Sequence, residues 1–554
     1  MKQLIMFVVV LATAVVSAQN PAGSDIAAKM SASENVFLHA NATAFVPGET
    51  LLYKLYCQTS YPGGLTSKVG YVELVSIDRK IIFTSKLFFS NGAADGDFFI
   101  SPSLATGNYK LIGYTNAILD NPLKIFQIDI KIINPFQVSG KLSTNSAERV
   151  PVPETSLVGS EYNLLGASKS FAKRQQISLN LQSVLQQFPN SNLSLSVRKN
   201  DNLGTTERLS AAEYSKLNST VAPTSTNTLP EWRGEIIEGT VSGANARKIP
   251  VALSIPGKTF EYKVANTDAN GNFTFNIDKV HSRPDVYLQV IGADRDKYTV
   301  TTKARRQPAY GQLQINDYFP SPQEADAIQE RSIAAQIQNA YYTRNADTLA
   351  SSEPNSLFYE SVEKKFVLSD YTRFPTFAQT IIEVIEGAYY EQNDGKYLLY
   401  VRDNNLGRPI PAPTLVLVDG LMLQDNADLF AYKASGIDHI STFSGVYLYG
   451  PTAFNGIISV VTKTQDFVTT EKSIVKADIL RPSAKKKYFR QTHDNSIEDQ
   501  KIPDYRYQLL WLPNIESSAV SFYSSDVGGN FELVIEGFSA KGEPISIRES
   551  FSVQ

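Results

Sequence analysis

The chain has a single cysteine, Cys57, among 554 residues, so it cannot form an internal disulfide. Beyond residue 18 no apolar run reaches the roughly 18 residues that a membrane-spanning helix requires. The 52 basic and 55 acidic residues give a net charge of −3, without the basic excess that nucleic acid or an anionic membrane would attract. These absences exclude a disulfide scaffold, a helical membrane protein and a nucleic-acid-binding protein.

Sequence motifs for catalysis or metal binding are also missing. The chain has no His-Glu-x-x-His, Cys-x-x-Cys, Gly-x-Ser-x-Gly or phosphate-binding glycine motif. Its four histidines lack a second histidine or cysteine at metal-ligand spacing: His39, His281, His439 and His493. We therefore predict that the chain is not an enzyme, and we assign no catalytic, cofactor-binding or metal-binding residue.

The remaining polar candidates have structural explanations. Cys57 lies in a predicted strand, where an isolated thiol is usually a small buried apolar group. Asp419, next to Gly420, is expected to form a turn, and Asp425 and Asp428 are expected in a solvated loop or at a helix start.

The N-terminus carries an export signal. Lys2 precedes an apolar run from Leu4 to Val16, and Ala18 offers a small residue for signal peptidase. The sequence predicts a signal peptide over residues 1–18 and an exported protein. The expected location is the periplasm or the periplasmic face of the outer membrane.

Tyrosine (28), phenylalanine (29), glycine (32) and proline (27) are plentiful, a composition of strands and turns. Over residues 34–137, short apolar strands alternate with turns such as Val46-Pro47-Gly48-Glu49, at the spacing of a β-sandwich. With the later Gly107-Asn108-Tyr109 strand, this segment resembles a macroglobulin-type domain. A second, weaker copy is expected over residues 150–225. The Gly-Cys-Gly-Glu-Gln thioester run of that superfamily is absent, which implies a binding scaffold.

Residues 235–305 resemble the regulatory-like domain found beside carboxypeptidases, through a Pro250-Val251 strand and a hairpin from Thr267 to Phe275. The resemblance implies a prealbumin-like sandwich. Asp268, Asn270 and Asn272 alternate as calcium ligands can, but a calcium loop needs more carboxylates. The pair Asn270-Gly271 is better explained as two positive-φ residues of a tight hairpin.

One helical connector is predicted over residues 318–345. Ser321, Pro322 and Glu324 form a capping box with proline at the first helical position. Ile333, Ile337 and Tyr341 recur on one face, which we expect to pack on a neighbouring sheet; a docking helix is the alternative.

Within residues 372–467, one strand ends in Val418-Asp419-Gly420, and farther on Tyr449-Gly450 is followed by Gly456-Ile457. With these landmarks the segment resembles the α+β plug domain of TonB-dependent outer-membrane receptors. Only 87 residues follow (554 minus 467), too few for a receptor barrel. A terminal immunoglobulin-like unit is expected over residues 503–554.

The predicted fold class is therefore mainly β: tandem immunoglobulin- or macroglobulin-like sandwiches, a prealbumin-like module, one helical segment and a plug-like module. This combination resembles envelope proteins of the Bacteroidetes. The leading functional hypothesis is a non-enzymatic adaptor or plug component that binds an outer-membrane β-barrel or lipoprotein, serving transport or secretion. The alternative is a ligand-binding protein for a glycan or peptide, which a surface cluster of aromatic residues in a groove would favour.

Overall fold

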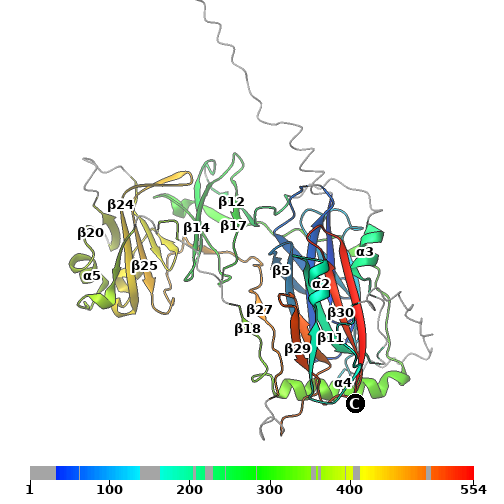
Figure 1. The fold of residues 1–554 in the computed structure, drawn as a ribbon. Helices are drawn as coiled ribbons and strands as arrows, with labels where there is room; N and C mark the ends of the chain where they lie inside the picture. Colours follow the sequence, from blue (N-terminus) through cyan, green and yellow to red (C-terminus); the bar gives the residue numbers. More distant parts are fainter. Residues whose placement is uncertain are drawn as a thin grey trace, which may run out of the picture.

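A computed structural model describes residues 33–137, 162–218 and 229–554, apart from residues 62, 202, 204–207, 244, 282, 351–356, 360–362, 394, 403–411 and 494–500. The protein is mainly β and consists of tandem sandwich modules with few helices, as predicted. The signal peptide expected at residues 1–18 lies outside the described residues. Figure 1 shows two sandwiches side by side at one end, a third in the middle and a mixed α/β module at the far end.

The first sandwich, module A, covers residues 34–132. One of its sheets has the order β1-β3-β6 and the other β2-β8-β7-β4-β5. The pleat sends alternate side chains such as Leu38, Leu55 and Leu111 into one apolar core. The strands are β1 (Glu34–Ala40), β2 (Ala44–Phe45), β3 (Thr50–Thr59), β4 (Val69–Val75), β5 (Ile81–Phe88), β6 (Ala93–Phe99), β7 (Gly107–Tyr114) and β8 (Phe126–Ile132).

The second sandwich, module B, is built from two distant parts of the chain. β11 (Asn192–Lys199) lies between β28 (Gln508–Leu512) and β30 (Gly529–Phe538) in a sheet of order β28-β11-β30-β31-β9. β10 (Gln176–Asn180) pairs with β29 (Ala519–Tyr523). The other elements are β9 (Ser170–Phe171), α2 (Gln182–Gln187), α3 (Ala211–Asn218) and β31 (Pro544–Val553).

This pairing corrects the expectation of two separate units at residues 150–225 and 503–554. β10 buries only its alternate residues Ile177 and Leu179, so it needs a facing sheet. That sheet is completed by strands from the C-terminal segment. The modules that follow residue 229 are therefore an insertion between two halves of one sandwich.

The middle sandwich, module C, carries two sheets, of order β15-β12-β17 and β14-β13-β16-β26. Its last strand, β26 (Val475–Lys476), returns from beyond module D and pairs with β16. Positive φ in the predicted hairpin is found at Gly271 (79°) but not at Asn270, which corrects the expected positive-φ pair. The other strands are β12 (Glu235–Ser242), β13 (Pro250–Ile255), β14 (Glu261–Asn266), β15 (Asn272–Ile277), β16 (Tyr287–Val290) and β17 (Thr299–Thr302).

The far module, D, is a five-stranded mixed sheet of order β19-β24-β25-β22-β23, in which β22 and β25 run parallel. One face is covered by α5, α6 and the β20–β21 hairpin; the other packs Leu415 and Leu417 against Phe260 and Tyr262 of module C. Its elements are β19 (Lys364–Val367), α5 (Phe377–Glu383), β20 (Ala388–Asn393), β21 (Lys396–Val401), β22 (Leu415–Val418), β23 (Leu421–Leu423), α6 (Ala427–Ala431), β24 (Ile437–Tyr449) and β25 (Thr452–Thr462).

Two chain segments join the ends of the molecule. The outgoing segment contains β18 (Thr348–Leu349), and it pairs with β27 (Lys486–Lys487) of the segment that returns from module D. The long helix α4 (Ala325–Ala340) follows a 3-10 turn, η3 (Pro322–Glu324), and lies across the foot of modules A and B (Figure 1). Other 3-10 turns are η1 (Arg295–Lys297), η2 (Tyr310–Gln312), η5 (Leu368–Asp370) and η6 (Ala434–Gly436).

The start of α4 is as predicted, but its packed face is not. The Ser321 amide donates to the Glu324 carboxylate at 2.9 Å, as in a capping box. Ile333, however, is 46 % exposed, while Ile328, Arg331 and Ala335 are buried. The predicted face is therefore wrong, because the ion pairs of Arg331 orient the helix about its axis.

The interface between modules A and B contains a buried lysine. Lys54 on β3 donates to Asn192, to the Pro513 carbonyl at 2.5 Å and to Asn514 at 2.9 Å. Burial lowers the pKa of Lys54 from its ordinary 10.5 to about 7, although nearby Asp95 acts in the opposite direction. Lys54 is therefore a titrating group inside the A–B interface.

We expect the free energy of unfolding to rise with pH between 7 and about 9 because of Lys54. In that range the unfolded chain binds this proton and the folded chain releases it, which gives a slope of up to about 1.4 kcal/mol per pH unit. Urea unfolding of wild type and Lys54→Met as a function of pH measures this slope. The variant should lose it, whereas Lys80→Met, at an exposed site, should keep it; an unchanged slope in Lys54→Met would contradict the assignment.

Candidate functional site

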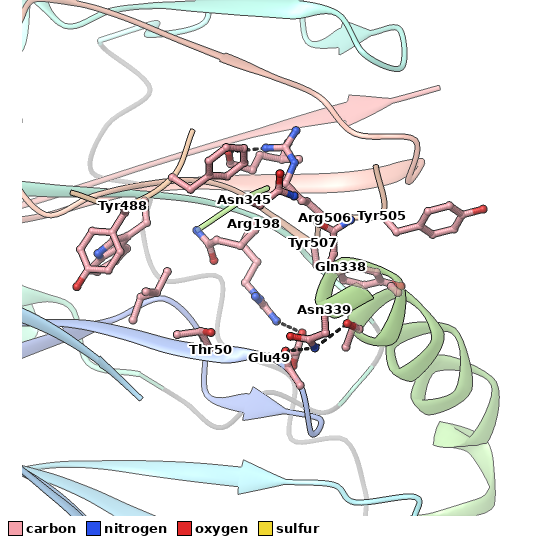
Figure 2. Close-up of a pocket in the computed structure, with 18 of the residues that line it drawn as sticks. Glu49, Thr50, Arg198, Gln338, Asn339, Asn345, Tyr488, Tyr505, Arg506 and Tyr507 are labelled. Atoms are coloured by element: carbon pink, nitrogen blue, oxygen red, sulfur yellow. Dashed lines mark hydrogen bonds and ion pairs between the residues drawn. The ribbon is translucent and has the colours of Figure 1, made fainter. Parts of the chain in front are cut away.

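A cavity of about 240 Å³ opens where modules A and B meet α4 and the returning segment. Its wall combines the turn before β3, the end of β11, the C-terminal half of α4 and residues 505–511 leading into β28. Figure 2 shows Gln338 and Asn339 of α4 beside Glu49, with Tyr488 at the opposite side of the view. We name it the foot cavity, since α4 lies at the foot of the two sandwiches.

A buried ion-pair network fixes the floor of the foot cavity. Arg331 donates to Glu49 through Nε and Nη2, both at 2.9 Å, and to Asp201 through Nη1 at 3.0 Å. Arg198 donates to the same Glu49 at 2.8 Å, and Arg331 also donates to the Ala44 carbonyl. The network links α4 to both modules, so the helix cannot shift without separating buried charges.

The charges of this network compensate one another. Burial alone would raise the pKa of Glu49, but Arg331 and Arg198 outweigh it and hold that pKa below its usual range. Two guanidinium groups, those of Arg331 and Arg198, thus face two acidic side chains, those of Glu49 and Asp201. A third guanidinium at the wall, that of Arg506, pairs with Asp504 at 2.6 Å.

Aromatic side chains make up much of the remaining wall. Three of these side chains are buried, those of Tyr488, Tyr507 and Trp511, while Tyr342 and Phe489 are 63 % and 36 % exposed. The indole nitrogen of Trp511 is buried and has no hydrogen-bond partner among the described residues.

Amide side chains supply neutral polar groups at the same wall. Asn339 donates to the carbonyls of Gly48 and Ala335, both at 2.8 Å, which orients its amide and leaves its oxygen as an acceptor. Gln338 and Asn345 also line the cavity. The ring of Tyr505 points away from these groups in Figure 2.

The residues considered in the sequence are not among those that line this cavity, although the ring of His39 lies beside that of Trp511, with 5.3 Å between the ring centroids. Cys57 is buried in the core of module A, as expected of a small apolar group, and burial raises the pKa of its thiol. His39 contacts Ser194 at 2.6 Å, His281 the Thr259 carbonyl, His439 Asp438, and His493 Asp504. In the part of the chain that the structure describes, no group of three or more metal-ligating side chains comes together.

The acidic candidates have the structural roles predicted for them. Asp419 has φ 49° and Gly420 φ 90° in the turn between β22 and β23, where Asp419 accepts from the Thr462 amide and hydroxyl. Asp425 accepts from the Ala427 amide at the start of α6, and Asp428 binds two threonines nearby. The structure therefore confirms Asp419 as a turn residue and Asp425 and Asp428 as residues at the start of a helix.

The Asp268 hairpin is likewise held by hydrogen bonds within the turn. The Asp268 carboxylate accepts from the amides of Asn270 and Asn272, both at 2.8 Å, and from the Asn272 side chain. These donors occupy the oxygens that a cation would need.

A second cavity, of about 380 Å³, lies between modules A and C. Charged groups surround it, and they pair mainly across the interface: Lys86 with Glu235 at 2.9 Å and Arg305 with Glu73 at 2.6 Å. These contacts join two modules, and the cavity offers fewer aromatic groups than the foot cavity. We therefore regard it as a junction between modules.

The aromatic and amide residues of the foot cavity are not apparent from the sequence. Asn339 and Trp511 belong to segments that the fold alone brings together, and neither forms part of a recognisable motif. The one local signal is the Tyr505-Arg506-Tyr507 run, which resembles an ordinary strand. Only the long-range pairing of module B brings these segments onto one wall.

No protein-family model matches the chain, and no curated protein matches it. Solved structures that it resembles include the α-2-macroglobulin of Salmonella reacted with methylamine (9 % identity, TM-score 0.17) and the native α-2-macroglobulin of E. coli (10 %, TM-score 0.23). Each match spans 94 % of this chain but only 23 % and 40 %, respectively, of the other protein. A tandem repeat of a large adhesion protein matches at 7 % identity with a TM-score of 0.14.

These scores are too low for the likeness to support an argument, so the β-sandwich assignment rests on the strand pairing described above. Within the residues described here, no helix has the length and apolar character to cross a membrane.

Proposed function

We propose that the chain is an exported, non-enzymatic envelope protein that binds a glycan or peptide ligand in the foot cavity. The observation that carries this proposal is the cluster of aromatic side chains around one cavity, with the exposed rings of Tyr342 and Phe489 beside the buried indole of Trp511. Binding sites combine apolar walls with a few oriented polar groups, which Asn339 and its neighbours supply here. In this proposal, modules C and D form an extension that projects away from the foot cavity.

The test uses ligand capture from envelope extracts. Immobilised wild-type protein should retain a small glycan or peptide that mass spectrometry identifies, whereas Tyr342→Ala/Phe489→Ala should retain at least tenfold less. Both side chains are partly exposed, so the double variant should still fold. Tyr371→Ala removes a similarly exposed ring from module D and should retain as much as wild type. Equal retention by the double variant would refute the proposal.

A second candidate function is the adaptor or plug component suggested by the resemblance of residues 372–467 to receptor plug domains. The observation that favours it is the β24–β25 hairpin. Among the residues that the structure describes, β19 pairs with residues 439–442 of β24, and farther along the strand Val446 and Leu448 are 37 % and 75 % exposed. A partner strand could add to this edge by β-augmentation. Recovery with a stoichiometric outer-membrane barrel from detergent extracts would support this function, and a soluble monomer would count against it.

A further inference from the structure

We infer that the ligand of the foot cavity is an uncharged glycan, of which one sugar unit enters the cavity. This inference rests on the proposed function of the cavity and names its ligand class. Three observations support it: the charged groups of the wall are already paired, aromatic and amide side chains line the cavity together, and the edge of the adjacent strand β28 is already hydrogen-bonded.

The charge balance favours an uncharged ligand. The three guanidinium groups at the wall, those of Arg198, Arg331 and Arg506, each have a carboxylate partner between 2.6 and 3.0 Å. An anionic ligand would have to break one of these buried pairs, and a cationic ligand would find only the acids already bound by the arginines and Asp347, whose carboxylate accepts from the Phe489 amide at 2.8 Å. Separating a buried ion pair is strongly unfavourable. A ligand that leaves the network intact is neutral.

The remaining wall suits a sugar ring. A sugar unit has an apolar C–H face and, around its rim, hydroxyl groups that both donate and accept hydrogen bonds. Aromatic rings offer flat apolar faces for the C–H face of a sugar, as the exposed rings of Tyr342 and Phe489 do here. Amides such as Gln338 and Asn345 hold a donor and an acceptor side by side, which matches two neighbouring hydroxyls. Asn339, whose two N–H groups are already donated, offers its oxygen as an acceptor.

The size of the cavity limits how much of the ligand enters. Its volume of about 240 Å³ is below the roughly 300–1,000 Å³ of pockets that enclose a drug-sized ligand. One sugar unit is therefore the expected occupant, and adjoining units would extend over the exposed ring of Tyr342.

The alternative, an extended peptide, would use the outer edge of β28, the end strand of its sheet. One carbonyl of this strand already accepts a hydrogen bond from a side chain of the same segment, since Arg506 donates to the Leu509 carbonyl at 3.0 Å. Peptides that add to a sheet depend on main-chain hydrogen bonds, so this contact disfavours that mode.

The test uses Trp511 as a reporter, because the chain has only two tryptophans. Full-length Trp232→Phe protein is titrated with cellohexaose, maltohexaose and mannohexaose, with a hexamer of galacturonic acid, and with a defined set of neutral hexapeptides. We expect saturable change in Trp511 fluorescence with at least one neutral hexasaccharide. Phe489→Ala and Asn345→Ala should each weaken that binding at least tenfold, while Tyr371→Ala should not change it.

The outcomes separate this inference from the proposed function. Binding of the acidic hexamer or of a hexapeptide, without a neutral hexasaccharide, would overturn the glycan assignment and leave a ligand-binding cavity. Failure of every probe, in protein whose circular dichroism matches wild type, would overturn both. Binding that survives both substitutions would place the glycan elsewhere and also overturn the inference.

Discussion

Arg331→Met is expected to lower the free energy of unfolding by about 3–5 kcal/mol, the cost of removing one partner from a buried ion pair. The side chain of Arg331 is only 3 % exposed, and it binds Glu49, Asp201 and the Ala44 carbonyl. With Arg331 removed, Arg198 can neutralise only one of the two acids. The loss should be measured by urea unfolding, with tryptophan fluorescence reporting on the region around Trp511.

Two further variants separate charge from packing in this prediction. In Arg331→Met/Asp201→Asn the network returns to zero net charge, because one arginine then faces one carboxylate, so part of the lost stability should return. Arg344→Met replaces an exposed arginine just beyond α4 and should change the unfolding energy by less than about 0.5 kcal/mol. If Arg331→Met proved as mild as Arg344→Met, the network would not be what holds α4 in place.

The same arginine shows where sequence reasoning reaches its limit. The start of α4 is encoded locally, since Ser321, Pro322 and Glu324 occupy adjacent positions and bond within one turn. The packed face depends on Glu49 and Asp201, which lie 282 and 130 positions away. A search for apolar periodicity therefore selects Ile333, whose side chain is largely outside the packed face.

Turns and strands show the same contrast between conformations set by neighbouring residues and contacts set by distant ones. The Asp419-Gly420 turn is correctly predicted, because its conformation is set by the turn residues themselves. The turn around Asp268 is also found, but only Gly271 of the predicted pair has a positive φ. The partner of a strand is not set in this way: the alternating pattern of β10 predicts a half-buried strand without saying what covers it. The foot cavity shares this property, since its wall is assembled from segments that long-range pairing brings together.

Removal of residues 508–554 is expected to unfold module B and leave modules C and D folded. This segment supplies 13 of the 22 buried apolar residues in the core of module B. Burial of each such side chain contributes about 1.5–3 kcal/mol, so the loss exceeds the roughly 5–15 kcal/mol by which a domain is stable. β11 would lose both neighbouring strands, and its buried residues Leu193, Leu195 and Val197 would face water.

Limited proteolysis followed by mass spectrometry tests this prediction. Truncated protein should be cut within residues 162–218, and wild type should be protected there; removal of Gln554 alone, which is exposed, should leave protection unchanged. Adding the separate fragment 503–554 should restore protection, because strand pairing between Ser196 and Val534 can form between two chains as it does within one. Protection of residues 162–218 in the truncated protein would mean that the N-terminal half folds as an independent sandwich. In that case β11 would not need β28 in order to fold, and the pairing of these two strands would not be what builds the wall of the foot cavity.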